Sequence, residues 1–145
     1  MQPATCAILD PDAGFRRRLR EWLERADEVA VVGEARDEPE ARELIAAQRP
    51  HIFLADLDAL GNAEGVARIA ARFPETRLLI LHRQEERAAV LEALRQGAWG
   101  HLAKEDLSPE EVVEAVRMVA QGEACLSPRV AGWLVEEVAR RRRGA

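Results

Sequence analysis

Long apolar runs and closely spaced cysteines are both missing from this chain of 145 residues. Its two cysteines, Cys6 and Cys125, lie far apart and match no metal-binding or redox spacing, which fits a reducing compartment. No secretory signal opens the sequence, and no apolar run approaches the length of a membrane span. We therefore expect a cytoplasmic protein that has no membrane partner.

Lysine is nearly absent as well. Of 21 basic residues 20 are arginine, and Lys104 is the only lysine. In so arginine-rich a chain, one retained lysine indicates a task that needs a compact ammonium group. The net charge of −5 disfavours general binding to nucleic acids, although residues 140–143 form a run of arginines that is typical of a solvated tail.

The most informative stretch that is present covers residues 51–58. Apolar residues from Ile52 to Ala55 run directly into two carboxylates, Asp56 and Asp58. Because strand side chains alternate between faces, both faces of this strand must be covered, as in a central parallel strand. The carboxyl ends of such strands open into the crevice where ligands bind, so Asp56 is a candidate functional residue. The alternative is that Asp56 only opens a turn.

Hydrophobic periodicity predicts five strands that alternate with five helices, followed by a sixth helix. The expected strands are 5–9, 29–32, 52–56, 77–81 and 99–104. The expected helices are 13–26, a segment between Asp37 and Pro50, 63–73, 85–96, 108–121 and a last one from Ser127 with an apolar stripe at Val130, Trp133, Leu134 and Val138. This alternation predicts the α/β class: a doubly wound, five-stranded parallel sheet in a three-layer α/β/α sandwich with an extra C-terminal helix.

Polar side chains follow four of the expected strands. Since all strands of a parallel sheet end at the same edge, these side chains should gather there. The set comprises Asp10, Asp12, Asp56, Asp58, His82 and Lys104. Their convergence favours a functional site over the turn interpretation of Asp56.

Several short motifs together resemble one known family. They are Val31 to Ala35, Leu91 to Ala98, Glu114 to Val116, Gly122 to Ala124 and Leu126 to Pro128. In this order and spacing they are similar to the receiver domain of bacterial response regulators of the NarL/FixJ type. The resemblance implies a flavodoxin-like receiver fold, a role in two-component phosphorelay signalling and transcription regulation, and a sensor histidine kinase or other signalling protein as partner. DNA would be bound only through an output domain that this chain does not contain.

The resemblance also implies roles for individual residues. Asp56 falls on the phosphoacceptor, Lys104 on the lysine that contacts the phosphoryl group, and Asp10 on the first acidic ligand of Mg²⁺, which Asp56 would also bind. Chemically, a carboxylate attacks phosphorus while cations neutralise the transferring group. The resemblance therefore makes Asp56 and Lys104 the centre of the expected site.

The chain departs from the family pattern at four places. Pro11 stands where a second acidic ligand is usual, and Asp12 lies one residue further on. His82 replaces the usual Thr or Ser at one switch position, and His101 replaces the aromatic residue at the other. The loop after Asp56 is also about two residues shorter than usual. We expect an atypical receiver that binds Mg²⁺ weakly or not at all, with Asp12 as a possible replacement ligand.

Two alternatives to a phosphorylated receiver remain open. The first is a phosphorylation-independent pseudo-receiver that acts as an interaction and dimerisation module. A haloacid-dehalogenase-like phosphatase, with Asp10 as nucleophile and Asp12 as general acid, ranks last, so we expect no enzyme.

The expected division of the chain is a receiver domain at 1–123 and a linker helix with a basic tail at 124–145. The last helix carries an apolar stripe, although the sheet already has five helices to cover it, so this stripe should pack on a neighbouring element or subunit. A homodimer is expected through the fifth and sixth helices, or through the surface around Trp99 and His101.

Overall fold

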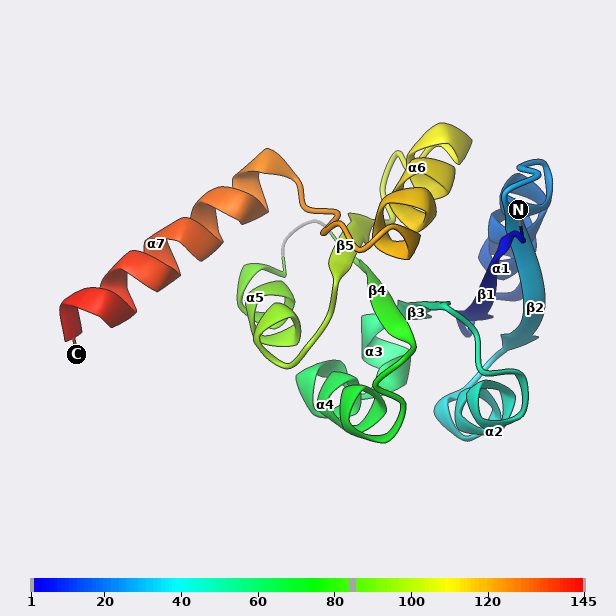
Figure 1. Cartoon of the computed structure of the whole chain (residues 1–145), viewed down its shortest axis with the longest axis horizontal. Helices are drawn as coiled ribbons and strands as arrows, with labels where there is room; N and C mark the ends of the chain where they lie inside the picture. Colours follow the sequence, from blue (N-terminus) through cyan, green and yellow to red (C-terminus); the bar gives the residue numbers. More distant parts are fainter. Residues whose placement is uncertain (1, 84–85, 145) are drawn as a thin grey trace.

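A five-stranded parallel sheet forms the centre of the molecule (Figure 1). The computed structural model describes residues 2–83 and 86–144. The strands lie in the order β2-β1-β3-β4-β5 and span Ala4–Leu9 (β1), Val29–Ala35 (β2), Ile52–Asp56 (β3), Arg77–His82 (β4) and Gly100–Ala103 (β5). This order is a doubly wound arrangement whose direction reverses between β1 and β3, where ligand sites of such sheets lie. The predicted α/β class is confirmed.

Helices cover both faces of the sheet (Figure 1). One face packs against α1 (Ala13–Glu24) and α6 (Pro109–Ala120). The other packs against α2 (Glu38–Gln48), α3 (Leu57–Leu60), α4 (Asn62–Arg72) and α5 (Arg87–Arg95). With α7 (Pro128–Gly144), seven helices lie in the part of the chain that the structure describes.

The central strand β3 shows why both layers are needed. Ile52 and Leu54 pack in the cluster with α1 and α6, whereas Phe53 and Ala55 pack in the cluster on the opposite face. All four side chains are fully buried. The apolar run therefore forms a central strand, as predicted, and it places Asp56 at the edge of the sheet.

Several element boundaries differ from the expected ones. Strand β2 continues past Val32 because its end pairs with β1, with Leu9 beside Ala35. Helix α6 begins as predicted, with a capping box between Ser108 and Glu111. The helix expected at 85–96 is observed over Arg87–Arg95, and its expected first residue lies outside the described residues.

The segment after β3 folds as a short helix where a loop was expected. Asp56 caps this helix, α3, and Gly61 ends it with a φ of 95°. Gly65 of α4 lies so near α3 that an added Cβ would stand 1.7 Å from the Leu60 carbonyl oxygen. A glycine is therefore required there for the two helices to pack.

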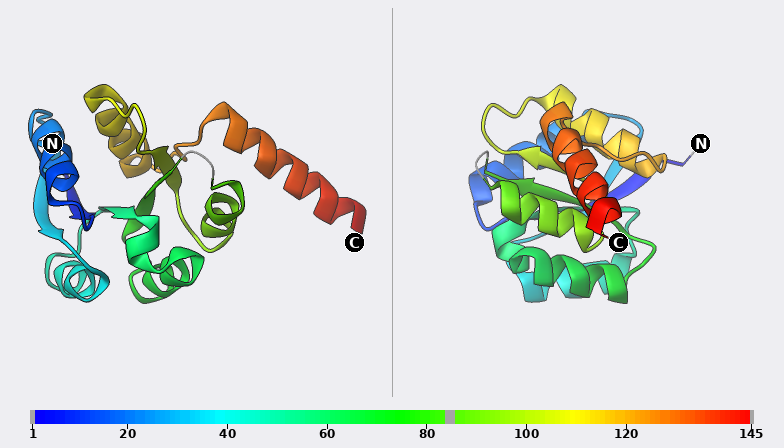
Figure 2. Two further views of the ribbon diagram at one scale, coloured as in Figure 1. Left: turned by 180° about the vertical axis from the view of Figure 1, so that it is seen from behind. Right: turned by 90° about the vertical axis from the view of Figure 1, so that its left-hand side faces the viewer.

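Helix α7 leaves the sheet beside β5 and lies outside α5, at the end of the sheet opposite β2 (Figures 1 and 2). Val130 is buried, and Trp133 lies against Arg87 of α5, with the guanidinium carbon 4.7 Å from the ring centroid. Val138 is 66% exposed, so at this residue the apolar stripe packs on no described element of its own chain, and packing on another subunit stays a prediction. Among the described residues, no helix combines the length and apolar character that a membrane crossing needs.

Candidate functional site

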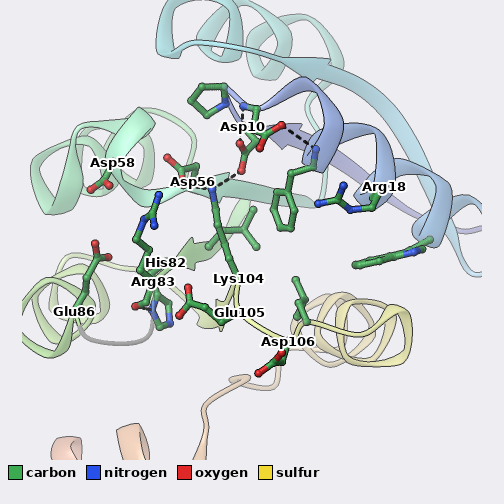
Figure 3. Close-up of a pocket in the computed structure, with 16 residues that line it drawn as sticks. Asp10, Arg18, Asp56, Asp58, His82, Arg83, Glu86, Lys104, Glu105 and Asp106 are labelled. Carbon is green, nitrogen blue, oxygen red and sulfur yellow. Dashed lines mark hydrogen bonds and ion pairs between the residues drawn. The ribbon is translucent and has the colours of Figure 1, made fainter.

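A cavity of about 660 Å³ opens at the carboxyl edge of the sheet, between the ends of β1, β3, β4 and β5 (Figure 3). The predicted polar residues Asp10, Asp12, Asp56, Asp58, His82 and Lys104 all line it. The gathering inferred from strand direction is therefore observed, and the cavity lies where β1 and β3 diverge.

Lys104 joins the two buried carboxylates at the centre of this cavity. Its Nζ lies 2.8 Å from Oδ2 of Asp10 and 2.6 Å from Oδ1 of Asp56. The lysine follows β5 and reaches across β4 to the ends of β1 and β3 (Figure 3). We call Asp10, Lys104 and Asp56 the ion triad. One positive charge thus stands between two negative ones.

The protonation of Lys104 follows from these contacts. Burial lowers the pKa of an ammonium, but the hydrogen bonds from Lys104 to Asp10 and Asp56 outweigh burial and raise its pKa above the ordinary value. The Nζ also lies 5.1 Å from the centroid of the Phe15 ring. The lysine is therefore charged across the physiological pH range.

Each carboxylate of the ion triad uses its second oxygen locally. Asp10 Oδ1 accepts the backbone N–H of Asp12 at 2.9 Å, and Asp56 Oδ2 accepts the backbone N–H of Ala59 at 2.9 Å, which caps α3. All four oxygens therefore have partners. Each carboxylate oxygen has two lone pairs, so these contacts restrain Asp56 without occupying it completely.

Asp12 caps the next helix. Its Oδ1 accepts the backbone N–H groups of Gly14 and Phe15 at 3.0 and 3.2 Å, which fixes the start of α1. This role explains why a carboxylate at this position forms no pair with Asp10. It also leaves the phosphatase hypothesis without a general acid beside its nucleophile.

The donor set fits a magnesium ion poorly. Mg²⁺ requires near-octahedral oxygen ligands. In the described part of the chain, no three His, Cys, Asp or Glu side chains are grouped so that they could hold a metal. Asp10 and Asp56 are both paired with Lys104, and Asp12 is bound to α1. Weak Mg²⁺ binding stays a prediction.

The two histidines at the expected switch positions lie together. His82 ends β4 and His101 lies in β5, and their nearest ring nitrogens, Nε2 and Nδ1, are 2.9 Å apart. Both are 6% exposed. His101 itself is therefore largely covered, and a dimer contact through the surface around Trp99 and His101 stays a prediction. Trp99 itself is 37% exposed.

Two arginines that sequence reasoning missed also line the cavity. Arg18 comes from α1 and Arg83 directly follows β4 (Figure 3). Arg83 could have been found because it follows His82, whose place at a strand end was predicted. Arg18 lies one helical turn after Phe15, so its direction required the observed docking of α1.

Comparison with known proteins gives consistent matches. Residues 6–117 match the family described as the response regulator receiver domain. A probable transcriptional regulatory protein NarL of Mycobacterium tuberculosis is 36% identical over 129 residues, which cover 88% of this chain and 59% of that protein. The transcriptional regulatory protein DegU of Brevibacillus brevis is 30% identical over 135 residues, or 92% of this chain and 57% of DegU. The chain thus spans less than two thirds of these curated relatives.

Solved structures agree with the sequence matches. The signal receiver domain of the putative response regulator NarL from Mycobacterium tuberculosis superimposes with a TM-score of 0.79 at 34% identity, covering 85% of this chain and all of that one. A LuxR-family two-component response regulator from Aurantimonas gives a TM-score of 0.82 at 30% identity, covering 95% of this chain and 99% of its own.

Proposed function

Because this chain belongs to the response regulator receiver domain family, and within it to the NarL type, we propose that it is an atypical receiver in which the ion triad restrains phosphorylation of Asp56. Its place in two-component signalling follows from the family. The observation that carries the atypical assignment is the pairing of Asp56 Oδ1 with Lys104 at 2.6 Å, while among the described residues no third carboxylate is grouped with Asp10 and Asp56 so that the three could hold a metal.

Phosphoryl transfer to Asp56 would form a bond between a carboxylate oxygen and phosphorus. The bond from phosphorus to the donor, a phosphohistidine nitrogen or the bridging oxygen of acetyl phosphate, would break and its electron pair would leave with the donor. Lys104 supplies one positive charge for the transferred group. His82 stands where a hydroxyl is usual, so one hydrogen-bond donor of ordinary receivers is replaced.

Phosphorylation-independent action is the second candidate function. It is supported by the resting site, where each of the four carboxylate oxygens already has a hydrogen bond or an ion pair. A sensor histidine kinase or another signalling protein would then bind the surface without transferring a phosphoryl group. We also propose a signalling partner, a homodimer contact and a DNA-binding output region beyond residue 145. These proposals are drawn from the curated relatives, two of which are named as transcriptional regulatory proteins.

Intact-mass spectrometry tests the proposal. The chain is incubated with acetyl phosphate and Mg²⁺, and Asp56→Asn serves as control because it removes only the acceptor oxygen. We expect slow or no addition of one phosphoryl group to the wild type and none to the control. Complete, rapid modification of the wild type would contradict restraint by the ion triad, whereas modification of Asp56→Asn would show that the acceptor lies elsewhere.

A further inference from the structure

A chain of hydrogen bonds runs from the cavity to the start of α7. The backbone N–H of Ser127 donates to Nε2 of His101 at 3.1 Å, and Nδ1 of His101 lies 2.9 Å from Nε2 of His82. Nδ1 of His82 lies 2.6 Å from the carbonyl oxygen of Arg83. We call this chain the histidine relay.

The direction of the histidine relay is fixed by its two ends. Ser127 N–H can only donate, so Nε2 of His101 must carry a lone pair, and a neutral His101 then has its proton on Nδ1. That proton is donated to Nε2 of His82, whose own proton must lie on Nδ1 and face the Arg83 carbonyl. The relay is therefore complete only when both imidazoles are neutral.

The far end of the histidine relay anchors the C-terminal arm, by which we mean residues 124–144. Cys125 N–H donates to the Trp99 carbonyl at 3.2 Å, and His101 N–H donates to the Cys125 carbonyl at 3.1 Å, so the arm begins along the outer edge of β5. Ser127 then caps α7, with its Oγ accepting Val130 N–H at 3.2 Å. Ser127 thus caps α7 through its hydroxyl oxygen and bonds the imidazole of His101 through its backbone N–H.

We propose that the histidine relay is a proton-sensitive fastening, which holds the C-terminal arm on β5 while both imidazoles are neutral and releases it when either one gains a proton. A protonated His101 would place Nε2–H against the Ser127 N–H, and a protonated His82 would place Nε2–H against Nδ1–H of His101. In each case two donors face each other. Because His82 also lines the cavity, the fastening joins the candidate site to α7.

The surroundings of the two rings are mixed in charge. Around them lie Glu86 and Arg87 at the start of α5, Glu105 and Asp106 after β5, Glu110, Glu111 and Glu114 on α6, and Cys125 and Arg129 on the arm. Burial, and next the neighbouring His82, lower the pKa of His101 from 6.5 to about 4. Side chains of the carboxylate, guanidinium and thiol classes ordinarily titrate outside the range from pH 5.5 to 7.5, so imidazoles dominate the proton uptake there.

The size of the effect follows from linkage. If release of the arm restores His101 to an ordinary pKa near 6.5, docking of the arm should weaken about tenfold between pH 7.5 and 5.5. Docking of the arm must weaken, and not strengthen, as the pH falls, because the docked state requires both imidazoles to be unprotonated. The proposal does not depend on whether Asp56 accepts a phosphoryl group.

The first test reads the tautomers directly. Long-range ¹H–¹⁵N NMR at pH 7.5 should show His82 and His101 with the proton on Nδ1. His51 is an internal control, because its Nδ1 accepts the Thr5 N–H at 3.0 Å and its proton must therefore lie on Nε2. An Nε2–H form at either His82 or His101 would overturn the proposal.

The second test measures release of the arm. Hydrogen-exchange protection factors of the Ser127 and Cys125 amides should fall about tenfold from pH 7.5 to 5.5, while Ala4, whose N–H bonds Glu28 at the other side of the sheet, should stay constant. In His101→Phe the two arm amides should be poorly protected at both pH values, and His51→Gln should behave as the wild type. Protection in His101→Phe equal to that of the wild type at pH 7.5, or a wild type insensitive to pH, would refute the fastening.

Discussion

The carboxyl edge of the sheet carries two polar clusters that are built on opposite electrostatic rules. The ion triad holds one ammonium between two carboxylates, and its groups are bound because they are charged. The histidine relay, one strand away, requires that both of its rings stay neutral. The carboxylates and the imidazoles are buried, so each group that loses its required charge state leaves an uncompensated partner. The difference teaches that polar groups at one edge can be compensated by opposite charges in one cluster and by hydrogen bonds between neutral rings in the other.

Removal of Lys104 should break the ion triad with the largest effect. Lys104→Met leaves Asp10 and Asp56 facing each other, with side chains that are 1% and 12% exposed. We expect a loss of about 3 kcal/mol in the free energy of unfolding, measured by urea denaturation at pH 7.5. Adding Asp56→Asn should recover more than half of it. A loss below about 1 kcal/mol in the single variant would mean that the two carboxylates are solvated without the lysine.

Acid should separate the two clusters. The pKa of His101 is lowered from 6.5 to about 4, so its contribution to stability is complete above pH 6.5 and is lost as the pH falls from there toward 4. We expect a loss of about 2 kcal/mol in the free energy of unfolding between pH 7.5 and 5, from urea denaturation at each pH. His101→Phe should remove most of this slope. An equal slope in both proteins would assign it to other groups.

An added carboxylate should convert the ion triad into a metal site. With Pro11→Asp a third carboxylate joins Asp10 and Asp56, and Mg²⁺ affinity should rise at least about tenfold, followed by NMR shifts of the Lys104 amide during titration. Asp12→Ala is the matched control. Because Asp12 caps α1, its loss should weaken the helix and leave Mg²⁺ affinity unchanged. Strong binding by the wild type that Asp12→Ala abolishes would show instead that Asp12 turns into the site.

An ion pair at the surface should show the smallest coupling energy, and it provides the reference for the coupling within the ion triad. Arg95 of α5 pairs with Glu137 of α7 at the surface. A double-mutant cycle with Arg95→Ala and Glu137→Ala should give a coupling close to the experimental error, and less still in high salt. A coupling comparable to that of Lys104 with Asp56 would mean that α7 is held chiefly by charge and would weaken the role assigned to the histidine relay.

The fold and the gathering of polar residues could be predicted because they depend on repeating rules. Alternation along β3 assigned Ile52 and Leu54 to one layer and Phe53 to the other, and parallel strand ends necessarily meet at one edge. The cap of α1 was also within reach, since Asp directly before a helix is a strong start signal, yet Asp12 was weighed only as a metal ligand and as a general acid. Its local hydrogen bonds decide its direction.

The details that could not be predicted depend on contacts between distant segments. The histidine pair requires the register of β4 and β5, in which His101 lies beside Ile80 and His82 follows two residues later on the same face. Helix α3 requires the close approach of Gly65 to Leu60. Periodicity describes one element at a time, so it contains neither piece of information.

The pairing of Cys125 with Gly100 has a consequence for the solubility of the sheet. An outermost strand with free N–H and C=O groups is a template on which another chain can add. Here the start of the C-terminal arm occupies that side of β5, so close that a Cβ on Gly100 would stand 2.6 Å from the Cys125 carbonyl oxygen. The start of the C-terminal arm thus keeps strands of other chains from pairing with β5. Any condition that releases the arm from β5 would also expose the unpaired backbone N–H and C=O groups of this edge strand, and self-association of the chain would begin there.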